Sequence, residues 1–248
     1  PAGSLASVAF LALAARAAYE AFLKTREQYF LRKAFVGYVN PQVLKKILRG
    51  SIHAELAGTR QRVCVMFCNI RGFTSRAERM APDMAIKLLN DYFSGAVSAV
   101  LKHEGTTSKL SGDRLIAFFG APQLLTNPEK NALEASQGVL ENLARLNEQL
   151  TARGMEPLTL GIGLHSGEVV LGQVGTLSHL EYTAIGNVLN VASQLEQAAA
   201  ELDYPVVCTA DVADAVNRAG GIKDLGERAL YGHPAVHVFG WRPRLIST

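Results

Sequence analysis

The stretch TTSKLSGDRLIAFFG, residues 106–120, contains two short apolar runs on either side of Ser-Gly-Asp. A three-residue turn between apolar runs is typical of a β-hairpin. Upstream, RVCVMFC (62–68) predicts a buried strand, and apolar residues recur every three or four positions from Pro82 to His103. That period predicts an amphipathic helix, so the segment 62–120 is expected to form a βαββ unit.

Further elements of the same kinds follow this unit. A second amphipathic helix is predicted over 129–150, and strands over 158–165 and 168–174 are expected to form a hairpin at Ser166-Gly167. The remaining predictions are a helix over 186–200, a strand over 205–209, a helix over 210–218 and a last strand over 235–239. The order β-α-β-β-α-β predicts an α+β fold with a ferredoxin-like core and added elements.

The order of the strands brings two polar positions together. In a βαββ unit the first strand lies antiparallel beside the hairpin. Asn69 at the end of that strand and Asp113 in the turn should therefore meet at one edge of the sheet. Two carboxylates at such an edge would hold Mg²⁺ for phosphoryl transfer, but only Asp113 carries one.

The first 62 residues differ in charge from the rest of the chain. Residues 1–23 are mostly apolar but contain Arg16 and Glu20, and the uninterrupted run 4–15 is shorter than the roughly 20 residues that span a bilayer. Residues 24–62 carry nine Lys or Arg and two Glu, whereas 63–248 carry fifteen basic and nineteen acidic residues. The basic block is thus local and does not indicate a nucleic-acid partner.

A basic block after an apolar run is typical of a cytoplasmic juxtamembrane segment. We therefore expect 1–23 to be the end of a transmembrane helix, with the chain at the cytoplasmic face of the inner (plasma) membrane. The alternative is a soluble helix that packs in a dimer. Tyr19, Leu23, Phe30 and Ala34 form a seam that suits pairing of parallel helices.

Two shorter segments connect this region to the predicted sheet. Asn40-Pro41 starts a second helix that Gly50 ends, so 24–50 are expected to be juxtamembrane signalling helices and 51–60 a linker. The cysteines, Cys64, Cys68 and Cys208, form no CxxC pair. They are expected to be buried thiols that pack in the core of a protein from a reducing compartment.

Four segments resemble the signature blocks of class III adenylate and guanylate cyclases, in the family's order. They are FCNIRGFTS (67–75), LSGDRLIAFFGAP (110–122), IGLHSGEVVLGQVG (162–175) and YTAIGNVLNVASQLE (182–196). The resemblance implies that 61–243 form a cyclase domain. It further implies an active site shared between two chains, in which the 3′-hydroxyl of ATP attacks its own α-phosphate and pyrophosphate leaves.

The resemblance also implies roles for individual residues. Lys109 and Thr183 match the pair that reads adenine, Asn190 matches the asparagine that orients the ribose, and the backbone N–H groups of Phe73 and Thr74 match the phosphate cradle. Asp113, the backbone of Ile70 and the residue at position 69 match the binding site for Mg²⁺ or Mn²⁺.

Three positions depart from the family pattern. Asn69 replaces the first metal Asp, Gln194 replaces the transition-state Arg, and His233 replaces a phosphate-binding Lys. An arginine that stabilises a phosphoryl transition state is worth roughly 10³–10⁵ in rate. We therefore expect a weakly active adenylate cyclase-type domain, and a homodimer would need both Asn69→Asp and Gln194→Arg to recover.

Two other functions remain open at this point. One is a degenerate cyclase that dimerises, binds ATP and acts as a regulatory module; the other is a purely structural dimerisation domain. The expected partners are ATP and a second copy of the chain, or a heterodimer with an intact cyclase.

Overall fold

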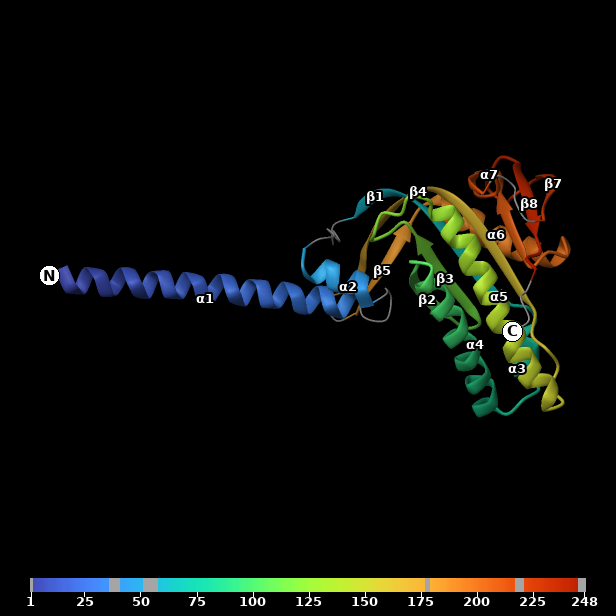
Figure 1. The fold of residues 1–248 in the computed structure, drawn as a ribbon, viewed down its shortest axis with the longest axis horizontal. Coiled ribbons are helices and arrows are strands. Elements are labelled where there is room, and N and C mark those ends of the chain that lie inside the picture. The colour runs from blue at the N-terminus through green and yellow to red at the C-terminus, as the bar shows by residue number, and fades with distance from the viewer. Residues whose placement is uncertain (1, 36–40, 51–57, 177–178, 217–220, 245–248) are drawn as a thin grey trace.

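A computed structural model describes residues 2–35, 41–50, 58–176, 179–216 and 221–244. One long helix, α1 (Ala2–Phe35), projects from a mixed α+β domain that holds all the strands (Figure 1). The short helix α2 (Pro41–Leu48) lies where α1 meets the domain.

The domain is built on an eight-stranded sheet with the order β2-β3-β1-β4-β6-β8-β7, to which β5 adds by pairing with β4. Its first four strands alternate with two helices along the chain as β1, α4, β2, β3, α5 and β4. In space these strands lie in the order β4-β1-β3-β2, and each is antiparallel to its neighbour. This arrangement confirms the ferredoxin-like core that the sequence predicts. The strands are β1 (Thr59–Ile70), β2 (Thr106–Ser111), β3 (Arg114–Phe119), β4 (Leu160–Thr176), β5 (His179–Ile185), β6 (Val206–Thr209), β7 (Ile222–Arg228) and β8 (Val236–Trp241).

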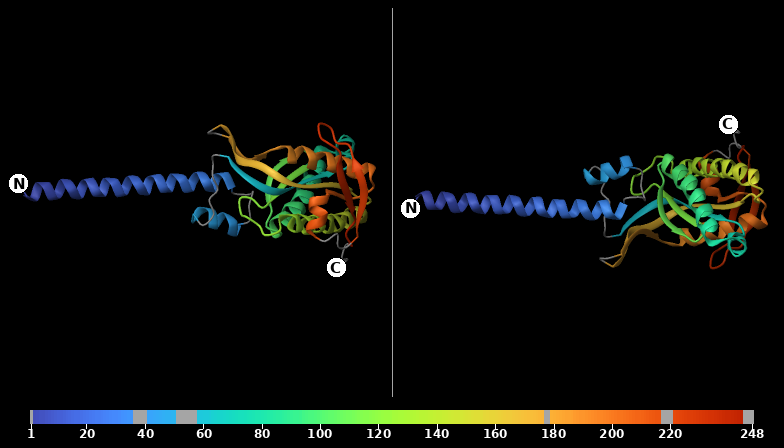
Figure 2. Two further views of the ribbon diagram at one scale, coloured as in Figure 1. Left: turned by 90° about the horizontal axis from the view of Figure 1, so that it is seen from above. Right: turned by 90° about the horizontal axis from the view of Figure 1, so that it is seen from below.

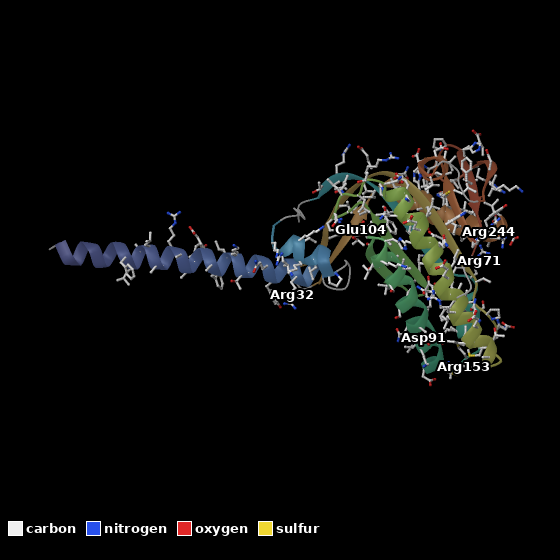
Figure 3. All side chains as sticks on the ribbon, viewed as in Figure 1. Arg32, Arg71, Asp91, Glu104, Arg153 and Arg244 are labelled. Atoms are coloured by element: carbon white, nitrogen blue, oxygen red, sulfur yellow. The ribbon has the colours of Figure 1, made fainter. Side chains whose placement is uncertain are left out.

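Helices cover both faces of the sheet. α4 (Pro82–Lys102) and α5 (Pro128–Ala152) pack side by side on one face, over a core that includes Met66, Cys68 and Leu115. α6 (Asn187–Glu201) covers the other face of the sheet (Figure 2). There Val65, Phe67 and Phe118 share a buried cluster with Val188 and Ala192 of α6. Alternate residues of β1 and β3 therefore point to opposite helices, as the two-residue period of a strand requires.

One predicted hairpin is wrong. β4 runs without interruption from Leu160 to Thr176, so Ser166-Gly167 is not a turn. Both residues pair with β1, Ser166 with Cys64 and Gly167 with Val63. A Cβ at Gly167 would lie 2.7 Å from Val188 Cγ2 of α6, so this glycine allows close helix packing. β4 continues beyond it and pairs with β5 from Val170 to Thr176.

Three short elements were not predicted: β5, β7 and α3 (Phe73–Ala77). β7 (IKDLGER) is mostly charged and α3 (FTSRA) is little longer than one helical turn, so neither shows a repeated apolar pattern. β5 (HLEYTAI) does alternate at Leu180, Tyr182 and Ala184, a strand pattern that the sequence prediction missed. The three cysteines are buried and free, as expected.

α1 and α2 differ in how they contact the domain. Ile47 of α2 is 2% exposed and packs in the same cluster as Val63 and Val65, so α2 is part of the domain core. In contrast, α1 leaves large apolar side chains exposed, including Phe10, Leu11, Leu13, Tyr19 and Phe22. Among the described residues, no helix combines the length and apolar character that crossing a bilayer requires. The described residues do not include Asn40 or positions 51–57 of the expected linker. For Phe30 and Ala34 of the expected seam, the backbone is described and the side chains are not.

Candidate active site

The edge of the sheet brings Asn69 and Asp113 together. Asn69 at the end of β1 lies opposite Arg114 of β3, and the next N–H, that of Ile70, donates to the backbone oxygen of Asp113 at 3.4 Å. The tight turn at Ser111–Arg114 depends on Gly112, which has a φ of 62°. Asp113 is thus held at the end of β1 by the pairing of the two strands.

A third polar group, the carboxylate of Glu196 from α6, reaches the same edge. Glu196 is 5% exposed and lies on the side of α6 that faces β4. Glycine at position 161 makes room for it, because a Cβ there would lie 2.9 Å from the backbone oxygen of Glu196 and 3.2 Å from Oε1. The close packing of α6 on β4 therefore sets the position of this carboxylate.

The guanidinium of Arg114 faces the Glu196 carboxylate. Arg114 Nη2 lies 3.8 Å from Glu196 Oε2, and its Cζ lies 5.9 Å from the centre of the Phe67 ring. Burial raises the pKa of Glu196, and the positive charge of Arg114 and the Asn69 amide offset part of that rise. Asp113 acts in the opposite direction, because a second negative charge nearby disfavours ionisation. A second guanidinium, that of Arg71, donates to the Tyr204 backbone oxygen at 2.9 Å.

Two oxygens of this cluster have no hydrogen-bond partner although they are buried, Asn69 Oδ1 and Glu196 Oε2. A buried acceptor without a donor is costly, so each should be satisfied by a ligand, a cation or a water. Oxygen donors are what Mg²⁺ and Mn²⁺ prefer, and Asp113 is near enough for its charge to act on the Glu196 carboxylate. These residues therefore fit a divalent cation in donor type, with Arg114 as a competing positive charge. Within the described ranges, no three His, Cys, Asp or Glu side chains gather into a metal-binding group.

The other expected catalytic residues form a second group, on the outer side of α6. Asn190 and Gln194 are four residues apart and share a helix face, whereas Glu196 lies about 200° around the helix from Gln194. Gln194 makes two hydrogen bonds with the backbone of Tyr231: Nε2 donates to the carbonyl at 3.0 Å, and Oε1 accepts from the N–H at 2.5 Å. Asn190 is exposed.

His233 lies at the amino end of α6. Its Nδ1 is 3.1 Å from Asn187 Nδ2. On β4, His165 Nδ1 lies 2.9 Å from Thr209 Oγ1. Burial lowers the pKa of His165, and the nearby His233 adds to the lowering, while Asp211 opposes it. Gln194 and His233 therefore both make contacts with polar groups around the segment that follows β7.

The expected nucleotide-binding residues occupy exposed strands and one helix start. Lys109 on β2 is exposed and Thr183 on β5 is partly exposed, and the two strands contact each other. Phe73 and Thr74 begin α3 directly after Gly72, whose φ is 66°. The Phe73 side chain packs into the core on the α4 and α5 side, so only its backbone is available to a phosphate.

Sequence reasoning missed Glu196 and Arg114, although each leaves a signal. Glu196 stands in line with Val188 and Ala192, so a charge interrupts the apolar stripe of α6 at a step of four. Arg114 alternates with Ile116 and Phe118 and so must share their face of the sheet. A charged residue at a position that periodicity assigns to the core is the signal that could have identified both.

The chain belongs to the family of adenylate and guanylate cyclase catalytic domains, since the family model "Adenylate and Guanylate cyclase catalytic domain" matches residues 56–233. Among curated proteins, adenylate cyclase 1 of Rhizobium meliloti is 33% identical over 65% of this chain, and an adenylate cyclase of Anabaena cylindrica is 31% identical over 78%. The chain spans only 24% and 38% of the length of these two relatives.

Solved structures agree with this assignment. The adenylyl cyclase CyaB from P. aeruginosa superposes with a TM-score of 0.66 at 27% identity, covering 75% of this chain and 95% of that one. The guanylyl cyclase Cya2 gives 0.66 at 26% identity, over 74% and 92%. A bacterial light-regulated adenylyl cyclase shares the fold over 89% of this chain and 63% of its own, with a TM-score of 0.70 at 24% identity.

Proposed function

We propose that this chain is an adenylate cyclase-type domain that converts ATP to cyclic AMP and pyrophosphate, with low turnover. The observation that carries this proposal is the sheet edge, where β1 and the β2–β3 turn place Asn69 next to Asp113. There α6 adds a buried Glu196 oxygen that has no hydrogen-bond partner. Such an edge suits a cation that binds a triphosphate. When bound, a divalent cation would neutralise charge that develops on the phosphates.

The residues of the chain would divide the work between two copies. Asp113 and Asn69 would hold the cation, and the N–H groups of Phe73 and Thr74 would donate to the phosphates. From the partner copy, Asn190 would orient the ribose. Low turnover follows because the neutral Gln194, bound to the Tyr231 backbone, supplies no fixed charge to the transition state.

ATP is the proposed nucleotide because Lys109 and Thr183 offer a donor and an acceptor that suit the edge of adenine. They stand on strands that contact each other. Replacing the pair with Lys109→Glu and Thr183→Cys should weaken the preference for ATP over GTP. Equal affinity of the parent chain for both nucleotides in calorimetry would contradict this assignment.

The experiment that tests the function is turnover with Mn²⁺, which tolerates poor ligand sets better than Mg²⁺. The purified chain is incubated with ATP or GTP, and cyclic nucleotides are separated and counted. Slow formation of cyclic AMP that disappears in Asp113→Asn supports the proposal. Binding of ATP with no product in either variant contradicts it.

A second candidate is a degenerate cyclase that binds ATP and acts as a regulatory module. It is favoured by the two hydrogen bonds that hold Gln194 on Tyr231, because an engaged side chain is not poised over a substrate. The distinguishing result is ATP affinity without turnover.

The proposed assembly is a homodimer, with a heterodimer containing an intact cyclase as the alternative. The exposed apolar residues of α1, including Tyr19 and Leu23, support pairing of this helix in the dimer. Sedimentation at tens of micromolar tests this, and a strict monomer would contradict it. Attachment of residues 1–23 to the inner membrane stays a prediction.

A further inference from the structure

We propose that Glu196 supplies the carboxylate that position 69 lacks, and that Arg114 competes with a divalent cation for it. The cation site would then consist of Asp113, Asn69 Oδ1 and Glu196 Oε2. This inference deepens the proposed function and rests on it for the identity of the cation, but it makes a claim about binding that does not depend on turnover.

The first support is the state of the two oxygens. Glu196 is 5% exposed, yet its Oε2 accepts no hydrogen bond, and Asn69 Oδ1 is likewise buried without a donor. Acceptors that are buried this deeply are normally satisfied. A single cation between the three oxygen-bearing side chains would satisfy both orphans at once.

The second support is the geometry of the Arg114 contact. A carboxylate and a guanidinium that form a closed ion pair approach to about 2.7–2.9 Å and often bind through two parallel hydrogen bonds. Arg114 Nη2 stays 3.8 Å from Glu196 Oε2 and is partly exposed, with 36% of its side chain accessible. Arg114 therefore offsets the charge of Glu196 without forming a direct hydrogen bond to it, so a cation can displace the guanidinium.

The third support is the way the backbone places Glu196. Gly161 and Gly163 on β4 leave no side chain between the sheet and this turn of α6, since a Cβ at either position would collide with Glu196 atoms. The carboxylate is therefore fixed over the end of β1, where Asn69 lies. The positive charges of Arg114 and Arg71 and the negative charge of Asp113 all act on the Glu196 carboxylate.

The experiment measures binding of Mn²⁺ alone, without nucleotide, from the loss of the free Mn²⁺ signal in electron paramagnetic resonance. Arg114→Ala should tighten Mn²⁺ binding by about tenfold or more, because removing a unit charge a few ångströms from a divalent cation is worth at least that much. Glu196→Gln, which keeps the shape of the side chain, should weaken it by a similar factor.

Matched controls come from the exposed pair Arg60 and Glu168, which are 3.7 Å apart on the same sheet. Arg60→Ala and Glu168→Gln should leave Mn²⁺ affinity unchanged. If Glu196→Gln fails to fold, as judged by circular dichroism, the double variant Arg114→Ala/Glu196→Gln replaces it, because both partners of the ion pair are then removed together. The double variant should bind Mn²⁺ more weakly than Arg114→Ala.

The inference is overturned if Arg114→Ala binds Mn²⁺ no more tightly than the parent chain, or if folded Glu196→Gln binds it equally well. A protein in which Mn²⁺ affinity follows Arg114 and Glu196 while no variant forms cyclic AMP would support this inference and contradict the proposed function. The two failures are therefore distinguishable.

Discussion

The residues that are expected to depart from the family pattern fall in two groups, and the structure surrounds the two groups differently. At the sheet edge, Asn69 is accompanied by a buried Glu196 and a guanidinium 3.8 Å from it, so charged groups are present there. On the outer side of α6, the neutral Gln194 binds the backbone of Tyr231, and His233 lies beside the Asn187 amide.

The difference predicts which of the two groups limits activity. A cation can be held by carboxylates that arrive from different elements, provided that the oxygens converge. A transition-state charge has to be present at one place, and a neutral amide with both its donor and its acceptor in use does not provide it. We therefore expect activity to be limited by the Gln194 group more than by the sheet edge.

The largest expected effect separates the two groups directly. Gln194→Arg should raise cyclic AMP formation by roughly 10³-fold or more, since such an arginine is worth roughly 10³–10⁵. Asn69→Asp should change it far less, because Glu196 already brings a carboxylate to the edge. This prediction replaces the expectation from the sequence that a homodimer needs both changes. Initial rates with Mn²⁺ for the two single variants and the double variant measure this, and a requirement for both changes would contradict the comparison.

Cation binding at the sheet edge can be weakened without removing a charged group, by moving the helix that carries Glu196. Gly161→Ala places a Cβ 2.9 Å from the Glu196 backbone oxygen, so α6 must shift away from β4. We expect a loss of about 1–3 kcal/mol in the free energy of unfolding, as for other overpacked sites. Urea unfolding measures this loss. Mn²⁺ affinity should also fall, because Glu196 moves with α6. An unchanged Mn²⁺ affinity would show that cation binding does not depend on the position of Glu196.

The Gln194 group can be tested for its contribution to stability. Gln194→Leu removes two hydrogen bonds to the Tyr231 backbone, and we expect a loss of about 1–2 kcal/mol in the free energy of unfolding. The matched control is Gln197→Leu, at an exposed position on the same helix. Equal losses in both variants would show that the Tyr231 contact contributes nothing specific.

The smallest effect concerns pH. Burial lowers the pKa of His165 below its ordinary value of about 6.5, so the folded state disfavours its protonated form. The neutral histidine contributes fully to stability above about pH 6.5, and that contribution is lost as the pH falls below it toward the folded-state pKa.

The measurement for His165 is the free energy of unfolding at pH 7.5 and pH 5.5. The parent chain should lose more stability on acidification than His165→Gln, which keeps a partner for Thr209. An identical pH dependence in the two proteins would show that His165 is not the group responsible.

The sequence by itself determined the order of the ferredoxin-like core and the meeting of position 69 with Asp113. Both follow from local patterns, the strand and helix periods and the turn before Arg114, and strand pairing then leaves little freedom. It also identified the family, because four motifs keep their order along the chain.

Only the tertiary structure decided the rest. Ser166-Gly167 looks like a turn in the sequence, but pairing with β1 and the close approach of Val188 make it a strand interior. Glu196 looks like one more helix charge, and it reaches Asn69 and Arg114 only because α6 packs on glycines of β4. Contacts between residues 69, 114 and 196 depend on the packing of distant segments, and no local pattern encodes them.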